Sequence, residues 1–260
     1  MGIVNVTPDS FSDGGQFYSP QQAIEHGLQL IEAGADLLDI GGESTRPGAA
    51  LVSEKEELAR VLPVLEGLRA CGVALSIDTQ KTAVMRAALA AGADMVNDVN
   101  ALQAPGALAA VAPSNAAVCL MHKQGDPQNM QQLPLYHDVV AEVKAFLQAR
   151  MDAAVAAGIE SNRIVIDPGF GFGKNLEHNV ALFRGLPGFE EMGVPLLAGL
   201  SRKSMLGKIA QLELNERIHA SVAAAVLAVM KGAKIVRVHD VKATADALAI
   251  VNAVEGWSDD

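Results

Sequence analysis

Polar and charged residues follow several short apolar runs in this sequence, at positions where they could do chemistry. The clearest case is the run 164–166, which ends in Asp167 and continues as a glycine-rich loop to Lys174. A β-branched run between turn residues is typical of a buried strand. Burying a carboxylate at the end of such a strand costs several kcal/mol of folding free energy unless the carboxylate is paired or hydrogen-bonded. Asp167 is therefore either a structural anchor or a contact for a ligand.

Two groups of such residues suit two kinds of ligand. Asp78, Asn97 and Asp167 offer side-chain acceptors and an amide, which suit a flat polar heterocycle with amino and lactam edges. Cationic side chains suit a diphosphate or a carboxylate, and five of them follow apolar runs: Arg46, Arg202, Lys203, Arg237 and His239. Because the formal net charge is −10, a small anionic substrate requires that such cations be gathered at one site.

Each of these residues also has a structural interpretation. A single Asp at a strand end is more often a helix N-cap than a ligand contact, so Asp78 with Thr79 and Asn97 with Asp98 are also candidates for capping the helices that follow. His239 taken alone is typical of a hydrogen-bonded core residue. Lys174 and Arg202 are expected to be solvated loop charges. The functional interpretation depends on the coincidence of many such groups on one face.

These residues need strands to position them, and the apolar runs recur along the chain. Strands are expected at residues 2–6, 36–40, 73–77, 95–96, 116–121, 164–166, 194–198 and 234–238. Helices are expected between them, with Ser19 before Pro20 as a typical helix start and Ser53 with Glu56 as a capping box. One helix is expected between the last two strands. Asp39 lies inside its strand and is expected to point into the barrel.

Repeated strand–helix units without a hairpin signal predict an all-parallel sheet within one domain, residues 1–260. Eight parallel strands of this spacing close most readily into a (β/α)8 TIM barrel. An open doubly wound sheet is the alternative, and the barrel is favoured because polar groups follow at least seven of the strands. In a barrel these loops converge on one face, where the active sites of such enzymes lie.

Composition narrows the class of protein. The net charge argues against a nucleic-acid surface, which needs a basic face. The longest apolar stretch, 220–230, is shorter than the roughly 18 residues that cross a bilayer, so no membrane association is expected. Cys71 and Cys119 form no C-x-x-C pair and are expected to be reduced core thiols of a cytoplasmic protein. The histidines lack the spacing of a zinc motif.

The motifs taken together resemble those of the dihydropteroate synthases of bacterial folate biosynthesis. The resemblance covers essentially the whole chain and rests on residues 1–15, 39–48, 76–79, 97–98, 120–122, 163–174, 201–204 and 237–240. It implies a transferase that condenses (7,8-dihydropterin-6-yl)methyl diphosphate with 4-aminobenzoate, giving 7,8-dihydropteroate and diphosphate. It also implies Mg²⁺, a 4-aminobenzoate position that sulfonamides imitate, and a homodimer, which would cover the apolar helix expected at 220–230.

The resemblance implies a role for particular residues. Those expected to act in catalysis are Asp78, Lys203 and Asp167. Those expected to hold the pterin are Asp78, Asn97, Met121, Asp167 and Lys203. Those expected to bind the diphosphate are Thr45, Arg46, Arg237 and His239, with Asn5 contributing to the Mg²⁺. Those expected to border the 4-aminobenzoate are Phe11, Pro47, Phe172 and Ser204.

Two other functions remain as alternatives. A pterin-dependent methyltransferase barrel would keep Asp78, Asn97 and Asp167, but it has no need of the 201–204 motif or of the diphosphate cations. A non-catalytic pterin-binding protein belongs to a different class. It need not require Mg²⁺, whereas the synthase should, and this requirement distinguishes the two.

Overall fold

A closed barrel of parallel strands forms the centre of the molecule. The computed structural model describes residues 1–7, 19–44, 51–125 and 134–256. Its sheet has eight strands in the order of the chain, namely β1 (Gly2–Asn5), β2 (Leu37–Gly41), β3 (Ala74–Asp78), β4 (Met95–Asp98), β5 (Ala117–Met121), β6 (Ile164–Asp167), β7 (Leu196–Ala198) and β8 (Ala233–Val236). The sheet closes on itself because Val238, just after β8, pairs in parallel with Gly2 of β1. The expected (β/α)8 barrel is confirmed.

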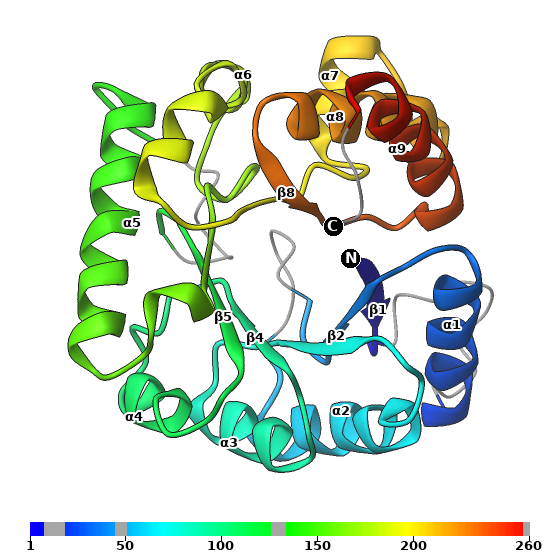
Figure 1. Ribbon diagram of the computed structural model, residues 1–260, viewed down its shortest axis with the longest axis vertical. Helices are drawn as coiled ribbons and strands as arrows, with labels where there is room; N and C mark the ends of the chain where they lie inside the picture. The colour runs from blue at the N-terminus through cyan, green and yellow to red at the C-terminus, as the bar shows by residue number, and fades with distance from the viewer. Residues whose placement is uncertain (8–18, 45–50, 126–133, 257–260) are drawn as a thin grey trace.

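Helices surround the strands (Figure 1). They are α1 (Pro20–Glu32), α2 (Glu54–Leu68), α3 (Thr82–Ala90), α4 (Ala107–Val111), α5 (Val139–Ala156), α6 (Leu176–Arg184), α7 (Ser204–Ala210), α8 (Ile218–Met230) and α9 (Val241–Glu255), with short 3₁₀ helices η2 (Ser161–Arg163), η3 (Leu186–Met192) and η4 (Leu214–Glu216). The prediction of one helix between β7 and β8 is wrong. Gln211 adopts a left-handed conformation that ends α7, so the chain forms α7 and α8 there.

The predicted helix starts depend on side-chain caps. Ser19 Oγ accepts the Gln22 amide at 3.3 Å, with Pro20 at the first helical position. Ser53 Oγ accepts the Glu56 amide at 3.2 Å, as a capping box requires. The reciprocal half of that box is not seen, because the Glu56 carboxylate pairs with Arg60 one turn further along α2. Both starts are confirmed.

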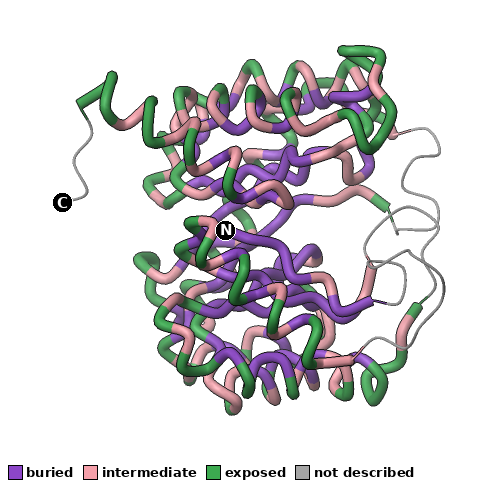
Figure 2. Tube along the Cα trace, turned by 90° about the vertical axis from the view of Figure 1, so that its right-hand side faces the viewer, coloured by how far each residue is buried: buried purple, intermediate pink, exposed green. Residues whose placement is uncertain are grey.

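Apolar packing occurs in two layers, and Figure 2 shows buried residues through the middle of the molecule and exposed ones on the outer helix turns. The larger core fills the space between strands and helices. A smaller apolar layer consists of Met1, Met95, Cys119, Val165 and Leu197. Since alternate strand residues face the same side, the positions two residues beyond Met95 and Val165 point the same way. These positions are Asn97 and Asp167, so the barrel lining changes from apolar to polar toward the carboxyl ends of the strands.

Candidate active site

Strand register brings the predicted site residues to the carboxyl end of the barrel. Asn5 pairs with Gly41, Gly41 with Asp78, and Asp78 with Asn97, across β1 to β4. Met121 pairs with Asp167 across β5 and β6. Gly41 contributes no side chain, and a Cβ there would lie 3.7 Å from Asp78 Oδ2. Side chains from several strands therefore meet at the carboxyl end of the barrel.

A charged floor, defined as Asp39, Asp78, Asn97 and Arg237, lies in the upper part of the barrel lining, with Asp39 one row deeper than Asp78 and Asn97. The Arg237 Nη2 group donates to Asp78 Oδ2 at 2.8 Å, and Arg237 Nε pairs with Asp39 Oδ2. Asn97 Nδ2 donates to the same Asp39 oxygen at 3.0 Å. The Asp39 side chain is fully buried, so the expectation that it points into the barrel is confirmed. One guanidinium thus joins two carboxylates that come from different strands.

Burial and mutual repulsion shift the protonation of the floor. Burial raises the pKa of Asp78 to about 7 against the opposing effect of Arg237, and the neighbouring Asp39 raises it further. Burial lowers the pKa of Arg237, but Asp39 and Asp78 outweigh this and raise it above its usual range. Arg237 therefore stays charged, and Asp78 is the group of this pair that takes up or releases a proton near neutral pH.

Asp167 and Lys203 face each other across Gly199. A Cβ at Gly199 would lie 3.8 Å from Lys203 Nζ and 3.9 Å from Asp167 Oδ2. Burial raises the pKa of Asp167, with Lys203 opposing the rise. Burial likewise lowers the pKa of Lys203 to about 8, with Asp167 opposing. The Lys203 ammonium donates to the Phe170 carbonyl and lies 4.9 Å from the centre of the Phe172 ring.

His239 and Arg202 are hydrogen-bonded within the loops after β7 and β8. Ser201 Oγ lies 3.0 Å from His239 Nδ1 and accepts the His239 amide at 3.2 Å. The Arg202 guanidinium forms a two-point ion pair with Asp240, with distances of 3.0 and 2.5 Å. Arg202 is therefore a paired charge, although its side chain remains 37% exposed.

The structural interpretations of Asp78, Asn97 and Lys174 are not supported. Residues at the N-cap positions of α3 and α4 are Lys81 and Gly106, so neither Asp78 nor Asn97 caps a helix. The expectation that Lys174 is a solvated loop charge is wrong, because its side chain is 2% exposed. The physical reason is that its ammonium reaches backbone carbonyls and His122 inside the loops, where it replaces its water shell with protein acceptors.

The remaining predicted residues are distributed around the same end of the barrel. Met121 is buried, Asn5 and Phe172 are half-buried, and Ser204 is exposed at the first position of α7. Outside the described residues lie Phe11, Thr45, Arg46 and Pro47. Of the expected diphosphate ligands, the structure therefore describes Arg237 and His239.

Sequence reasoning missed a buried ion-pair cluster beside the site. Lys81 Nζ donates to Glu43 Oε2 at 2.9 Å and pairs with Glu57, whose side chain is fully buried. Glu43 Oε1 also accepts the amide of Val52 at 2.9 Å. Glu57 lies in the first turn of α2, where an acidic residue is ordinary, so no signal in the sequence distinguished it.

Metal-binding groups are sparse in the part of the chain that is described. Among those residues, no group of three or more His, Cys, Asp or Glu side chains could hold a metal ion. Asn5 provides one half-buried amide oxygen at the end of β1. Mg²⁺ prefers oxygen donors and commonly completes its shell with water and substrate phosphates. Asn5 fits that chemistry as a single protein ligand.

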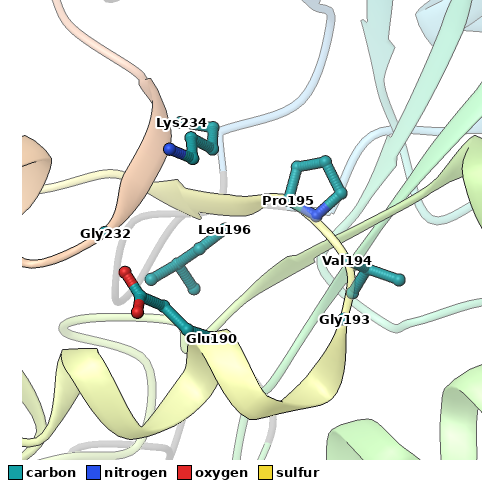
Figure 3. A pocket seen from close by; sticks show the side chains of 7 residues that line it. All are labelled: Glu190, Gly193, Val194, Pro195, Leu196, Gly232 and Lys234. Atoms are coloured by element: carbon teal, nitrogen blue, oxygen red, sulfur yellow. The ribbon is translucent and has the colours of Figure 1, made fainter.

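A hollow of about 430 Å³ lies at the other end of the barrel (Figure 3). Its lining comes from η3 and from the residues that begin β7 and β8: Glu190, Gly193, Val194, Pro195, Leu196, Gly232 and Lys234. Enzymes with this fold place their chemistry at the carboxyl ends of the strands. Because the hollow is lined by residues at the starts of the strands, whereas the charged floor lies toward their carboxyl ends, the two are separate.

The fold and the charged floor define a pterin-binding barrel, since a model of the pterin binding enzyme family matches residues 1–239. A dihydropteroate synthase of Neisseria meningitidis is 56% identical over 95% of this chain and 89% of its own length. The chain belongs to the dihydropteroate synthase family. Among solved structures, the Yersinia pestis synthase with a sulfonamide drug complex has a TM-score of 0.94 at 52% identity, covering 98% of this chain and 93% of that one. The Xanthomonas albilineans synthase with 7,8-dihydropteroate has a TM-score of 0.90 at 53% identity, covering 99% and 93%.

Proposed function

We propose that this chain condenses (7,8-dihydropterin-6-yl)methyl diphosphate with 4-aminobenzoate, forming 7,8-dihydropteroate and diphosphate. The observation that carries this proposal is the meeting of Asp78, Asn97, Asp167, Lys203 and Arg237 at the carboxyl end of one barrel. Family membership supports it, as does the 7,8-dihydropteroate bound by the Xanthomonas relative.

Polar side chains at the centre of the site can form hydrogen bonds with a pterin. Asp167 and Asn97 are 5% exposed, and Asp78 is 9% exposed, so all three are buried polar groups of the barrel lining. Such groups pair with the amino and lactam edges of a pterin. Met121 and the Phe172 ring supply apolar surface, and the Lys203 ammonium lies over Phe172. We assign Asp78, Asn97, Asp167, Met121 and Lys203 to the pterin, and Phe172 to its border with the 4-aminobenzoate.

The diphosphate takes the cationic side of the site. We assign Arg237 and His239 to it within the described chain, and the expectation for Thr45 and Arg46 remains a prediction. Mg²⁺, held by Asn5, would supply neutralisation of the leaving diphosphate. Ser204, Phe172 and the undescribed Phe11 and Pro47 stay assigned to the 4-aminobenzoate.

The reaction develops positive charge on the methylene carbon and negative charge on the leaving diphosphate, and the site must stabilise both. The bond between the methylene carbon and the diphosphate oxygen breaks, the arylamine nitrogen forms the new bond to that carbon, and the amine loses a proton. The methylene carbon becomes cationic as the diphosphate leaves, so preorganised groups of both signs stabilise the transition state. Asp78 supplies the negative charge near the carbon, and Arg237 supplies the positive charge toward the leaving group. An arylamine is neutral at pH 7, so no strong general base is needed.

The decisive experiment measures diphosphate release from the pterin diphosphate, with and without 4-aminobenzoate and Mg²⁺. Release that requires both, with dihydropteroate formed in equal amount, would establish the synthase. Pterin binding without turnover would instead favour a pterin-binding protein. Methyl transfer from a methylated folate, with no diphosphate released, would favour the methyltransferase.

We also assign a homodimer to the face formed by α8 and α9, which lie side by side in Figure 1. Leu227 and Met230 of α8 are 50% and 48% exposed, and Ile250 and Val254 of α9 are 67% and 75% exposed. Exposed apolar side chains in neighbouring helices suit a protein interface. Sedimentation should give a dimer at micromolar concentration, and Leu227→Glu should give a monomer. A monomeric parent protein would remove this assignment.

We propose a cytoplasmic location on the basis of the cysteines. Cys71 and Cys119 are free thiols, as proteins of reducing compartments usually have. Within the described residues, no helix combines the length and hydropathy needed to pass through a membrane. Fractionation of cells that produce the protein would test the location directly.

A further inference from the structure

Lys174 is an unusual residue of the barrel because its charge is buried and its nearest partners are neutral. The side chain is 2% exposed. Its Nζ atom lies 2.9 Å from His122 Nδ1, 2.9 Å from the Gly169 carbonyl and 3.1 Å from the Phe172 carbonyl, with a longer contact of 3.5 Å to the His122 carbonyl. An ammonium has three N–H donors, and the three short contacts supply one acceptor for each.

The partners of Lys174 come from two different loops. Loop 5 is defined here as residues 122–125, after β5, and loop 6 as residues 168–175, after β6. His122 belongs to loop 5, whereas Gly169 and Phe172 belong to loop 6. The ammonium therefore ties the two loops together, and it is the only side-chain cation among the described residues that is hydrogen-bonded to both.

The backbones of the two loops are in direct contact around this ammonium. A Cβ at Gly169 would lie 1.9 Å from the His122 carbonyl oxygen, and a Cβ at Gly173 would lie 2.2 Å from the Gln124 carbonyl oxygen. Both glycines have positive φ, at +70° and +62°, where other residues are strained. A side chain at either glycine would collide with a loop 5 carbonyl, so the two loops meet backbone to backbone. The contacts of Lys174 are among the polar contacts that join them there, together with the hydrogen bond from the His122 amide to the Asp167 carbonyl at 3.0 Å.

Loop 6 carries the groups that face the proposed pterin. It begins directly after Asp167, whose Oδ1 accepts the Gly169 amide at 2.7 Å. Its Phe170 carbonyl and Phe172 ring hold the Lys203 ammonium. Lys174 makes none of these contacts itself, but its ammonium donates to the carbonyls of Gly169 and Phe172, which lie on either side of Phe170.

We propose that Lys174 is a positioning residue, whose buried ammonium, with a neutral His122 as acceptor, clamps loop 6 onto loop 5 and so fixes Asp167, Phe172 and Lys203 for binding the pterin. This assignment rests on the proposed function for the identity of the ligand. The clamp itself, defined as Lys174 with His122, is a property of the two loops and does not depend on the ligand.

The protonation of the clamp agrees with its geometry. Burial lowers the pKa of Lys174 to about 7, with Asp167 opposing the fall and Lys203 adding to it. Burial, and then Lys174, lower the pKa of His122 to about 3. A proton between the two groups therefore stays on Lys174. His122 must then accept through Nδ1 and carry its own proton on Nε2.

The first test compares Lys174→Met with Leu147→Ala, a variant of a fully buried side chain in α5. Calorimetry with a pterin lacking the diphosphate should show affinity reduced about tenfold or more in Lys174→Met, the effect expected when a charge-assisted hydrogen bond is lost. Amide exchange in residues 169–173 should be faster. Leu147→Ala should lower the melting temperature but leave pterin affinity within about twofold, because generic destabilisation does not move loop 6. Equal affinities for Lys174→Met and the parent protein would overturn the proposal.

A second pair of variants acts on the acceptor. In His122→Asn the amide oxygen can occupy a position close to that of Nδ1, whereas His122→Leu removes the acceptor. His122→Leu should weaken pterin binding and accelerate exchange in loop 6, and His122→Asn should restore most of both. The same losses in the two variants would show that His122 acts by packing alone and would contradict the clamp.

Nitrogen NMR of the parent protein tests the clamp without a variant and without ligand. Between pH 5 and 6, below the pKa of about 7 of Lys174, His122 should be neutral, with a proton on Nε2 and none on Nδ1. A protonated Nδ1 would overturn the assignment. If the parent protein binds no pterin, the proposed function fails, while amide exchange and the histidine tautomer still decide whether the clamp exists.

Discussion

Arg237 and Lys174 are cations at the same end of the barrel, but their partners differ in charge. Arg237 joins the carboxylates of Asp39 and Asp78, and its side chain remains 21% exposed. Lys174 is 2% exposed and has two backbone carbonyls and an imidazole nitrogen as short-range partners. One cation is part of a charged surface within the site, and the other lies inside the loops behind it.

This difference in partners indicates which part of a ligand each cation affects. The environment of Arg237 contains ionisable acids, so its electrostatics change with pH and with the charge of a ligand. The close partners of Lys174 are neutral, and its contacts decide where loop 6 lies. Variants of Arg237 should therefore lose affinity mainly for ligands that carry the diphosphate. Variants of Lys174 should lose affinity for any pterin, with or without the diphosphate.

Replacing Arg237 should have the largest effect. Arg237→Ala removes a cation assigned to the diphosphate and leaves Asp39 and Asp78 without their partner. Truncating one member of a buried charge pair costs roughly 2–5 kcal/mol, so affinity for the pterin diphosphate should fall roughly thirtyfold to several thousandfold. Calorimetry against a pterin lacking the diphosphate is the comparison, and its affinity should fall much less. Equal weakening of both ligands would refute the assignment.

Asp167→Asn should have the next largest effect, and it should not depend on the diphosphate. The amide keeps an oxygen that can accept the Gly169 amide, so loop 6 should stay in place. The charge-assisted hydrogen bond to the pterin is lost, which costs roughly 1.5–3 kcal/mol, or about a tenfold to hundredfold loss of affinity. Thermal unfolding should change little. Unchanged pterin affinity would count against the role of Asp167, whereas loss of folding would mean that the carboxylate is chiefly structural.

The strands and their polar ends could be predicted because their signals are local. Runs such as 164–166 are β-branched and end in a polar residue, and parallel register then brings Asp78 and Asn97 to one level. The division between α7 and α8 could not be predicted, since it depends on a left-handed Gln211, and glutamine is not a residue that marks such a conformation.

The burial of Lys174 could not be predicted for a different reason. A lysine after a glycine-rich loop has the sequence pattern of a solvated charge, and its partner His122 is 52 positions away. Its acceptors are mostly backbone carbonyls, which every residue has and which leave no trace in the sequence. The burial of Glu57 against Lys81 is similar, because only the packing of α2 on the loop after β3 brings them together.

The pH dependence of turnover should distinguish the roles of Arg237 and Lys174 further, because only Arg237 is paired with a carboxylate that titrates. Asp78 has its pKa raised to about 7 by burial and by Asp39, against Arg237, and it must be ionised to oppose the developing positive charge. Below about pH 7, kcat/KM for the pterin diphosphate should therefore fall about tenfold for each unit of pH. Above about pH 8 it should fall again, because Lys203, whose pKa burial lowers to about 8, loses its charge. Because Asp39, Asp78 and Arg237 interact, the apparent pKa belongs to the group.

The control for this pH dependence is Asp78→Asn, which should have lower kcat/KM and no limb near pH 7. Lys174→Met should keep the limb, since the titrating carboxylate remains in the charged floor. A limb that persists unchanged in Asp78→Asn would show that another group, or the substrate itself, is responsible.

The smallest effect is expected at Arg202, a third cation of the same face. Its two-point pair with Asp240 is partly exposed, and such pairs contribute up to about 1 kcal/mol to stability. Arg202→Ala should therefore lower the free energy of unfolding by no more than about 1 kcal/mol, measured by urea denaturation. Its pterin diphosphate affinity should change far less than that of Arg237→Ala, because Arg202 faces Asp240 and not the charged floor. A loss of affinity as large as that of Arg237→Ala would mean that Arg202 leaves Asp240 to bind the diphosphate. Both arginines would then act on the diphosphate, and Lys174 alone would act through loop 6.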